Sequence, residues 1–151
     1  MADPCVLFHF AFQPASRAAR LALGEARIDW TDTPVRPWEE DCPVNDFNPS
    51  GLPPVVQTTD RGRPLTLCEL PAVLGWIEDQ QKGPLLLPAD AAERAEARRL
   101  TGWFERRFTD DVDAVLLHER MEKPLLRLGP HWCGTIDDLL DACRAVTCAP
   151  A

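Results

Sequence analysis

The sequence predicts a protein of the α/β class, in which a small mixed domain is followed by a helical region. Three observations support this prediction. A short β-rich run, Val6 to Phe10, is followed by a helical stretch and then by another run rich in β-branched residues. Two further apolar runs flank the turn formers at Asp60 to Gly62. After residue 90, apolar residues recur at helical spacing.

The first elements indicate a β-α-β unit. Gln13-Pro14-Ala15-Ser16 interrupts the first strand, and we expect Ser16 to cap a helix from Arg17 to Glu25. Ile28 to Val35 is expected to form the second strand. A helix that connects two strands of one sheet implies that the strands are parallel and that the crossover is right-handed.

The next elements indicate a ββα unit. Turn formers between residues 37 and 48 predict a loop with at most a short helix that ends near Asn48. The run at Val55 and Val56 and the run from Pro64 to Leu67 predict a hairpin. Glu69 to Gln80 is expected to be a helix, with its buried face made by Ala72, Val73, Trp76 and Ile77. The order of elements is that of a thioredoxin-like domain, which we assign to residues 1–80.

The remaining residues predict a linker and a partial all-α domain. Residues 81–90 are Pro-rich, and Asp90 with Glu93 forms a capping box that opens a long helix. A second helix is expected from Asp110 to Lys123, ended by Pro124, and a third over residues 135–146. Residues 91–151 therefore form the helical region. We expect its apolar side chains to lie uncovered, namely Trp103, Phe104, Phe108, Val112, Leu116 and Leu117.

Composition narrows the class of partner. The net charge of −8 disfavours nucleic acid, because proteins that bind it concentrate Lys and Arg against the phosphates. The sequence contains no secretory signal and no membrane-spanning run, so we expect a cytoplasmic protein. In that compartment the six cysteines should be free thiols. His131 and Cys133 lack a second ligand pair, and we predict no metal site.

Several motifs occur in a fixed order between Val6 and Phe108. They are a P-x-S-R turn, RAARLALGE, NPSGLPPVV, the Glu69-x-x-Ala72-Val73 step and LLPADAAERAEARRL. In this ordered set the chain resembles the glutathione S-transferase superfamily. The resemblance implies a thioredoxin-like domain that binds glutathione, followed by a helical domain.

The resemblance also implies which residues face glutathione. Pro54 matches the family's cis-proline, and Pro53 stands where a backbone N–H and C=O pair with the cysteinyl part of glutathione. Proline has no N–H, so one of these two bonds is lost. Glu69 matches the Glu of a Glu-Ser step that holds the γ-glutamyl carboxylate, but Leu70 replaces the Ser. These losses predict a degenerate glutathione site.

The candidate catalytic residues are Gln13 and Ser16. Gln13 stands where many bacterial relatives carry Cys, and it cannot form a mixed disulfide. Ser16 matches a position from which a hydroxyl can stabilise a glutathione thiolate, and its alternative role is that of a helix cap.

The second half, from Trp103 to Leu126, is similar to FtsZ-binding, transferase-like bacterial division proteins. We therefore expect a non-catalytic binding module with an FtsZ-like protein partner and no resident cofactor. One alternative is a transferase that conjugates glutathione, as a weakly bound co-substrate, to small electrophiles. Another is a truncated family member without function. The family resemblance also implies a homodimer.

Overall fold

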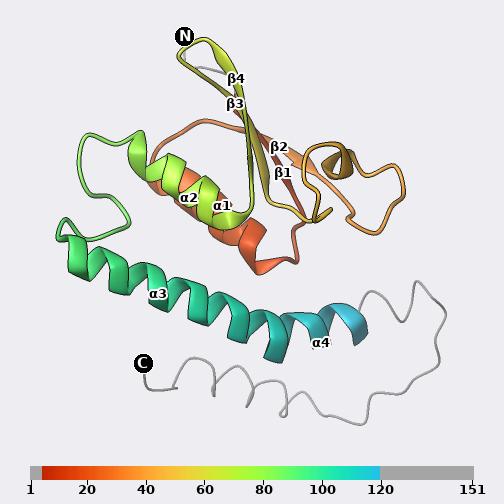
Figure 1. Cartoon of the computed structure of the whole chain (residues 1–151). Coiled ribbons are helices and arrows are strands. Elements are labelled where there is room, and N and C mark those ends of the chain that lie inside the picture. The colour runs from red at the N-terminus through yellow and green to blue at the C-terminus, as the bar shows by residue number, and fades with distance from the viewer. Residues whose placement is uncertain (1–4, 120–151) are drawn as a thin grey trace. The chain divides into compact units, whose positions relative to one another are not determined.

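The computed structural model describes residues 5–119 and divides the chain into two compact units, Met1–Asp90 and Ala91–Ala151. Each unit is considered by itself. Figure 1 shows their elements. In order, the first unit contains β1 (Val6–His9), α1 (Pro14–Glu25), β2 (Thr31–Pro34), the 3₁₀ helix η1 (Pro43–Asp46), β3 (Val55–Asp60), β4 (Arg63–Cys68) and α2 (Leu70–Asp79). The predicted α/β class, with a thioredoxin-like domain ahead of a helical region, is confirmed.

The four strands form one mixed sheet in the order β2-β1-β3-β4. β1 runs parallel to β2, as the predicted β-α-β unit requires, and antiparallel to β3. β3 and β4 form the predicted hairpin, in which Asp60 pairs with Arg63. Arg61 and Gly62 lie between them with positive φ angles of 49° and 78°. Positive φ at both central residues is typical of a type I′ turn, whose twist matches that of the strands.

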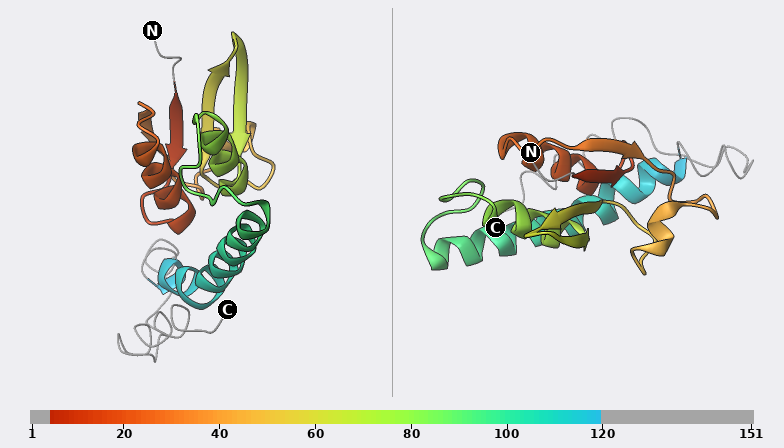
Figure 2. Two further views of the ribbon diagram at one scale, coloured as in Figure 1. Left: turned by 90° about the vertical axis from the view of Figure 1, so that its left-hand side faces the viewer. Right: turned by 90° about the horizontal axis from the view of Figure 1, so that it is seen from above.

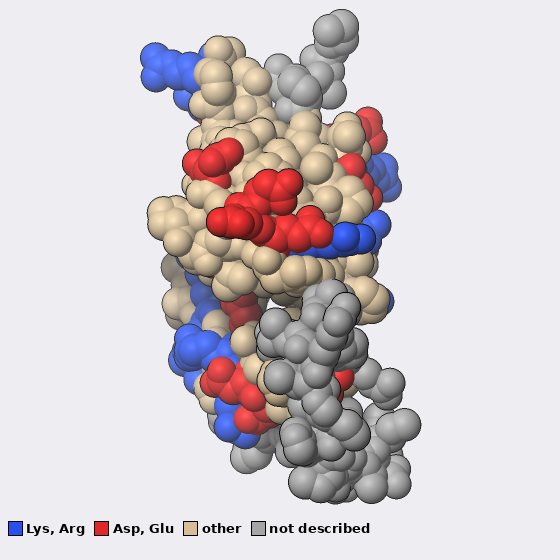
Figure 3. Space-filling model, turned by 90° about the vertical axis from the view of Figure 1, so that its right-hand side faces the viewer, with Lys and Arg blue, Asp and Glu red and all other residues tan. Residues whose placement is uncertain are grey.

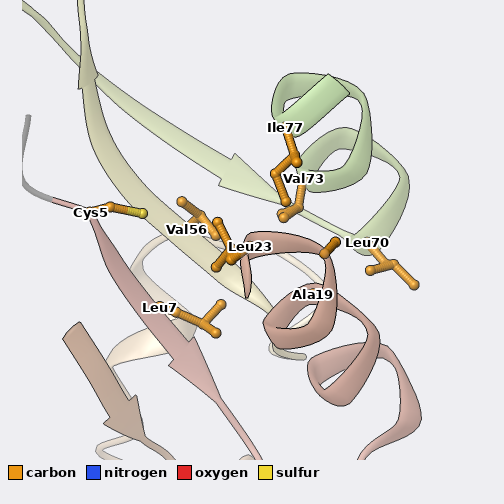
Figure 4. Close-up of a cluster of buried hydrophobic side chains, with 9 residues drawn as sticks. Cys5, Leu7, Ala19, Leu23, Val56, Leu70, Val73 and Ile77 are labelled. Atoms are coloured by element: carbon orange, nitrogen blue, oxygen red, sulfur yellow. The ribbon is translucent and has the colours of Figure 1, made fainter. Parts of the chain in front are cut away.

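Both helices of the first unit pack on the same face of the sheet (Figures 1 and 2). Figure 4 shows the cluster of buried side chains between them and the strands. Cys5 contributes from just before β1, the strands contribute Leu7 and Val56, α1 contributes Ala19, Ala22 and Leu23, and α2 contributes Leu70, Val73 and Ile77. A smaller cluster made by Val35, Cys42, Val44 and Val55 packs the loop containing η1 onto the sheet.

Three expectations for the first unit are wrong in detail. α1 begins at Pro14 with Gln13 as its N-cap, so Ser16 lies inside the helix and does not cap it. Proline favours the first helical turn because it has no N–H to leave unpaired. β2 begins at Thr31, since the chain after α1 forms a turn in which Ile28 N–H bonds to the Leu23 carbonyl. On α2, Ala72 is exposed, although it was predicted to lie on the buried face of this helix.

The described part of the second unit, up to residue 119, is one helical run whose hydrogen-bonding pattern changes along its length. α3 (Ala91–Phe108) continues without a break into a π-helical turn (Thr109–Asp113) and then α4 (Ala114–Leu117). The predicted start of a separate helix at Asp110 is therefore wrong. Val112 is fully buried, against expectation. The side chains of Trp103, Phe104, Phe108, Leu116 and Leu117 are half-buried.

Other expectations fall on residues outside the described range. They concern the end of the second helix, Pro124, the helix at 135–146 and the pair His131 and Cys133. Within residues 5–119, no helix is both long and apolar enough to cross a bilayer.

A buried histidine lies on the helix-covered face of the sheet. The side chain of His9 is 6% exposed, and its Nε2 lies 3.4 Å from Oδ1 of Asp32. The same carboxylate accepts hydrogen bonds from the Trp30 indole, at 2.9 Å, and from the Arg20 guanidinium, at 3.3 Å. Burial lowers the pKa of His9, Asp32 opposes this effect and Arg20 adds to it. His9 is therefore neutral in the folded protein at neutral pH.

This burial predicts a loss of stability in mild acid. Below about pH 6.5, the ordinary pKa of histidine, His9 is protonated in the unfolded chain but stays neutral in the folded protein, where its pKa is lower. The free energy of unfolding should therefore decrease as the pH decreases. Urea unfolding of the His9→Gln variant between about pH 7 and pH 5 should show a smaller fall than the wild type. His118→Gln, at an exposed position of the second unit, is the control. Equal pH dependence in the wild type and the His9→Gln variant would contradict the assignment.

Candidate functional site

The loop between η1 and β3 carries the first group of candidate residues. The Pro53–Pro54 bond is cis, as predicted, and both prolines are buried. Gly51 precedes them with a φ of +68°, a conformation that favours glycine. A Cβ at Gly51 would lie 3.1 Å from Oδ1 of Asn45, so the position is restricted by space as well.

Asn48 organises this loop. Its side chain is buried, and its Nδ2 donates to the Leu52 carbonyl at 2.8 Å and to Oε1 of Glu69 at 3.0 Å. Its Oδ1 accepts the Ser50 N–H at 3.2 Å. The Ser50 hydroxyl donates to the same Glu69 oxygen at 2.8 Å. The motif that resembles the family's loop is thus tied to the residue that precedes α2.

Glu69 has a strained backbone. Its φ of 69° and ψ of 141° lie in a region that non-glycine residues rarely adopt, at a cost on the order of 1–3 kcal/mol. Such a conformation persists only where its surroundings enforce it. The hydrogen bonds from Asn48 and Ser50 hold the side chain, and the Glu69 carbonyl accepts the Val73 N–H at 3.2 Å. The carboxylate is therefore engaged by the protein's own groups.

The start of α2 differs from a carboxylate-binding helix end in two ways. Leu70 is 5% exposed and belongs to the core cluster beneath α1 and α2, so its side chain contributes to packing. Pro71, the next residue, has no N–H to offer an anion. Sequence reasoning identified the missing hydroxyl at Leu70 but overlooked Pro71, although the residue type itself carries that signal.

Gln13 and Ser16 form a second, separate group at the start of α1. Ser16 is fully buried; its hydroxyl accepts the Phe10 N–H at 3.2 Å and donates to Oε1 of Gln13 at 3.1 Å. The structure brings these two candidates together and brings Asn48, Ser50 and Glu69 together. Across residues 5–119, no hydrogen bond joins one group to the other.

The thiols near the candidate residues are poorly suited to nucleophilic chemistry. The Cys68 thiol donates to the Phe47 carbonyl at 3.2 Å, and its pKa is raised by burial and then by the charge of Glu69. Burial also raises the pKa of Cys5. Since the thiolate is the reactive form, both groups are protonated and weakly nucleophilic at neutral pH. Residues 5–119 contain no group of three or more His, Cys, Asp or Glu side chains that could hold a metal ion.

An aromatic surface beside these residues was missed from the sequence. Phe12 is 67% exposed and Trp38 is 45% exposed, although both rings are large and apolar. Each contacts Phe10, at centroid distances of 5.6 Å and 5.1 Å. The available signal was the position of two bulky aromatic residues, Phe12 and Trp38, just beyond the predicted strands.

Comparison with known proteins shows which family the first unit resembles. Residues 13–80 match the family model of the glutathione S-transferase N-terminal domain. Over 123 residues, which cover 82% of this chain and 54% of the relative, the chain is 51% identical to FtsZ-localized protein A from Caulobacter vibrioides. The chain therefore spans about half the length of this curated relative.

Solved structures agree with the sequence comparison. FzlA from C. crescentus is 46% identical, with a TM-score of 0.78, and the match covers 93% of this chain and 62% of that chain. A glutathione S-transferase from Rhodospirillum rubrum is 31% identical, with a TM-score of 0.73, over 95% of this chain and 61% of that chain. The predicted resemblance to transferases and to FtsZ-associated relatives is confirmed.

The Asn48 network predicts unequal effects of two substitutions. Asn48→Ala should lower the free energy of unfolding by about 2–3 kcal/mol, because it removes two donated bonds and leaves the Leu52 carbonyl without that partner. Ser50→Ala removes two bonds at the surface, the one donated to Glu69 and a long one accepted from the Leu52 N–H at 3.3 Å, and should cost about 1 kcal/mol or less because both are exposed to water. Urea unfolding of both variants measures the difference. A cost for Ser50→Ala that matches or exceeds that of Asn48→Ala would show that the buried network is not dominant.

Proposed function

Because residues 13–80 match the family model of the glutathione S-transferase N-terminal domain and most of the chain is similar to FtsZ-localized protein A, we propose that this protein is a non-catalytic binding module for an FtsZ-type division protein. The observation that carries the proposal is the 51% identity over 82% of the chain. An FtsZ-type partner implies that the protein works in the cytoplasm.

The candidate site supports a binding role over catalysis. The Ser16 hydroxyl is buried and already makes two hydrogen bonds within the protein. Leu70 packs into the core, and Pro53 and Pro71 lack the N–H groups that a peptide-like ligand would use. A site that retains its fold while its ligand-binding groups face inward is expected when selection acts on partner binding.

The second candidate function is glutathione conjugation. It is favoured by the retention of Glu69 at the family's carboxylate-binding position, next to the N–H groups of Leu70 and Ala72. Glutathione would then act as a weakly bound co-substrate. Against this alternative, Oε1 of Glu69 accepts hydrogen bonds from the side chains of Asn48 and Ser50. These bonds favour a structural role for the carboxylate over binding of a ligand.

The division-protein proposal predicts direct association with FtsZ filaments. The purified chain should pellet with filaments of Caulobacter FtsZ in a saturable manner, with a dissociation constant on the order of micromolar, as for regulated interfaces of modest size. Pelleting with actin filaments serves as the control for trapping in a polymer. A chain that stays in the supernatant at every FtsZ concentration would contradict the proposed function.

A further inference from the structure

Three aromatic rings from two loops are in contact on the first unit. Phe10 and Phe12 lie on the loop after β1, and Trp38 lies on the loop after β2. Phe10 is buried and contacts both other rings, at interplanar angles of 61° with Phe12 and 86° with Trp38. We call these three residues the aromatic cluster. Two of its rings remain largely open to solvent, which is unusual for side chains of this size in a well-packed unit.

A hollow adjoins the aromatic cluster. Its volume is about 560 Å³, and its walls come from Phe10 and Ala11, the end of β2 and the loop that leads to η1. The volume lies within the range of about 300–1,000 Å³ that is typical of ligand pockets. The hollow therefore has room for one or two side chains of a partner beside the exposed rings.

The segment that forms one wall of this hollow carries a net negative charge. Residues 36–46 carry one arginine against four carboxylates, a net charge of −3. Arg36 is bound to Glu39 at 2.9 Å, and Asp41 is exposed on the wall of the hollow with no ion pair among residues 5–119. Figure 3 shows acidic side chains gathered on the face formed by this part of the unit. An anionic ligand is therefore disfavoured here.

We propose that the aromatic cluster and the acidic hollow together bind a basic segment of a protein partner. An arginine or lysine side chain stacks on the exposed faces of Phe12 and Trp38, where the electrons of the rings attract a cation. A neighbouring basic residue places its charge in the hollow against Asp41. Because the exposed rings of Phe12 and Trp38 are not part of the lining of the hollow, one occupant that uses both must be a chain. The inference deepens the binding role proposed above by naming the surface and the chemistry of its partner.

A titration of the isotope-labelled full chain with a tetra-arginine peptide tests this surface by NMR. Saturable shifts should include the Trp38 indole and the amides of the loop after β2. Asp41→Lys should weaken binding by about tenfold and Phe12→Ser by about three- to fivefold, because each removes one part of the attraction. Asp60→Lys makes the same charge change at the hairpin turn and should leave the affinity within about twofold.

Three outcomes would overturn the proposal. They are the absence of a saturable shift at Trp38, an equal loss of affinity in Asp41→Lys and Asp60→Lys, and equally tight binding of a tetra-glutamate peptide. The peptide assay contains no FtsZ, so its result separates the two proposals. Peptide binding without pelleting on FtsZ filaments would reject the division role and leave this surface standing.

Discussion

The carboxylate of Glu69 is the constraint on which the candidate site depends. It holds a backbone conformation that costs on the order of 1–3 kcal/mol by accepting hydrogen bonds from Asn48 and Ser50. These bonds connect the loop before β3 to the start of α2, two segments about twenty residues apart in sequence. The strain is sustainable because Asn48 is buried and makes further bonds within its own loop. Removing the carboxylate would leave the strain of Glu69 without these two hydrogen bonds, while the Asn48 amide would keep its bonds to Leu52 and Ser50.

In the same unit, residues at positions that resemble ligand-binding positions of transferases are held by contacts within the protein. Leu70 packs in the core, and the Ser16 hydroxyl accepts the Phe10 N–H and donates to Gln13. Both side chains therefore contribute to stability. The groups that remain outward are of a different kind: exposed rings and carboxylates around a hollow. A surface of this character suits a protein partner better than an anionic tripeptide.

Much of the first unit was predictable because its signals are local. The turn at Asp60 to Gly62 and the helix between two strands follow from residue types at short spacing, and both are present. Helix starts were less well determined. Periodicity does not distinguish Pro14 from Arg17 as the first residue of α1, and the Ser16 side chain met partners within the protein instead of capping the helix.

Contacts between distant segments could not be read from the sequence. The sequence indicates that Leu70 stands where a serine hydroxyl is expected, but the place of its side chain in the core depends on how α1 and α2 pack together. The contact of Phe10 with Trp38 joins two loops whose separation in space no local pattern encodes. In the second unit, the π-helical turn at Thr109–Asp113 joined two helices that the sequence predicts as separate, and it coincides with the burial of Val112.

We propose that the positions resembling the glutathione site of transferases serve the fold in this chain, and calorimetric titration of the purified chain with glutathione tests this proposal most directly. Loss of the Pro53 donor and of a hydroxyl at Leu70 should weaken binding by about 30- to 1000-fold, on the order of 2–4 kcal/mol. The account therefore predicts no heat of binding at micromolar glutathione and at most a weak, millimolar interaction. Micromolar affinity would contradict it, because the remaining backbone groups beside Glu69 would then suffice to hold the ligand.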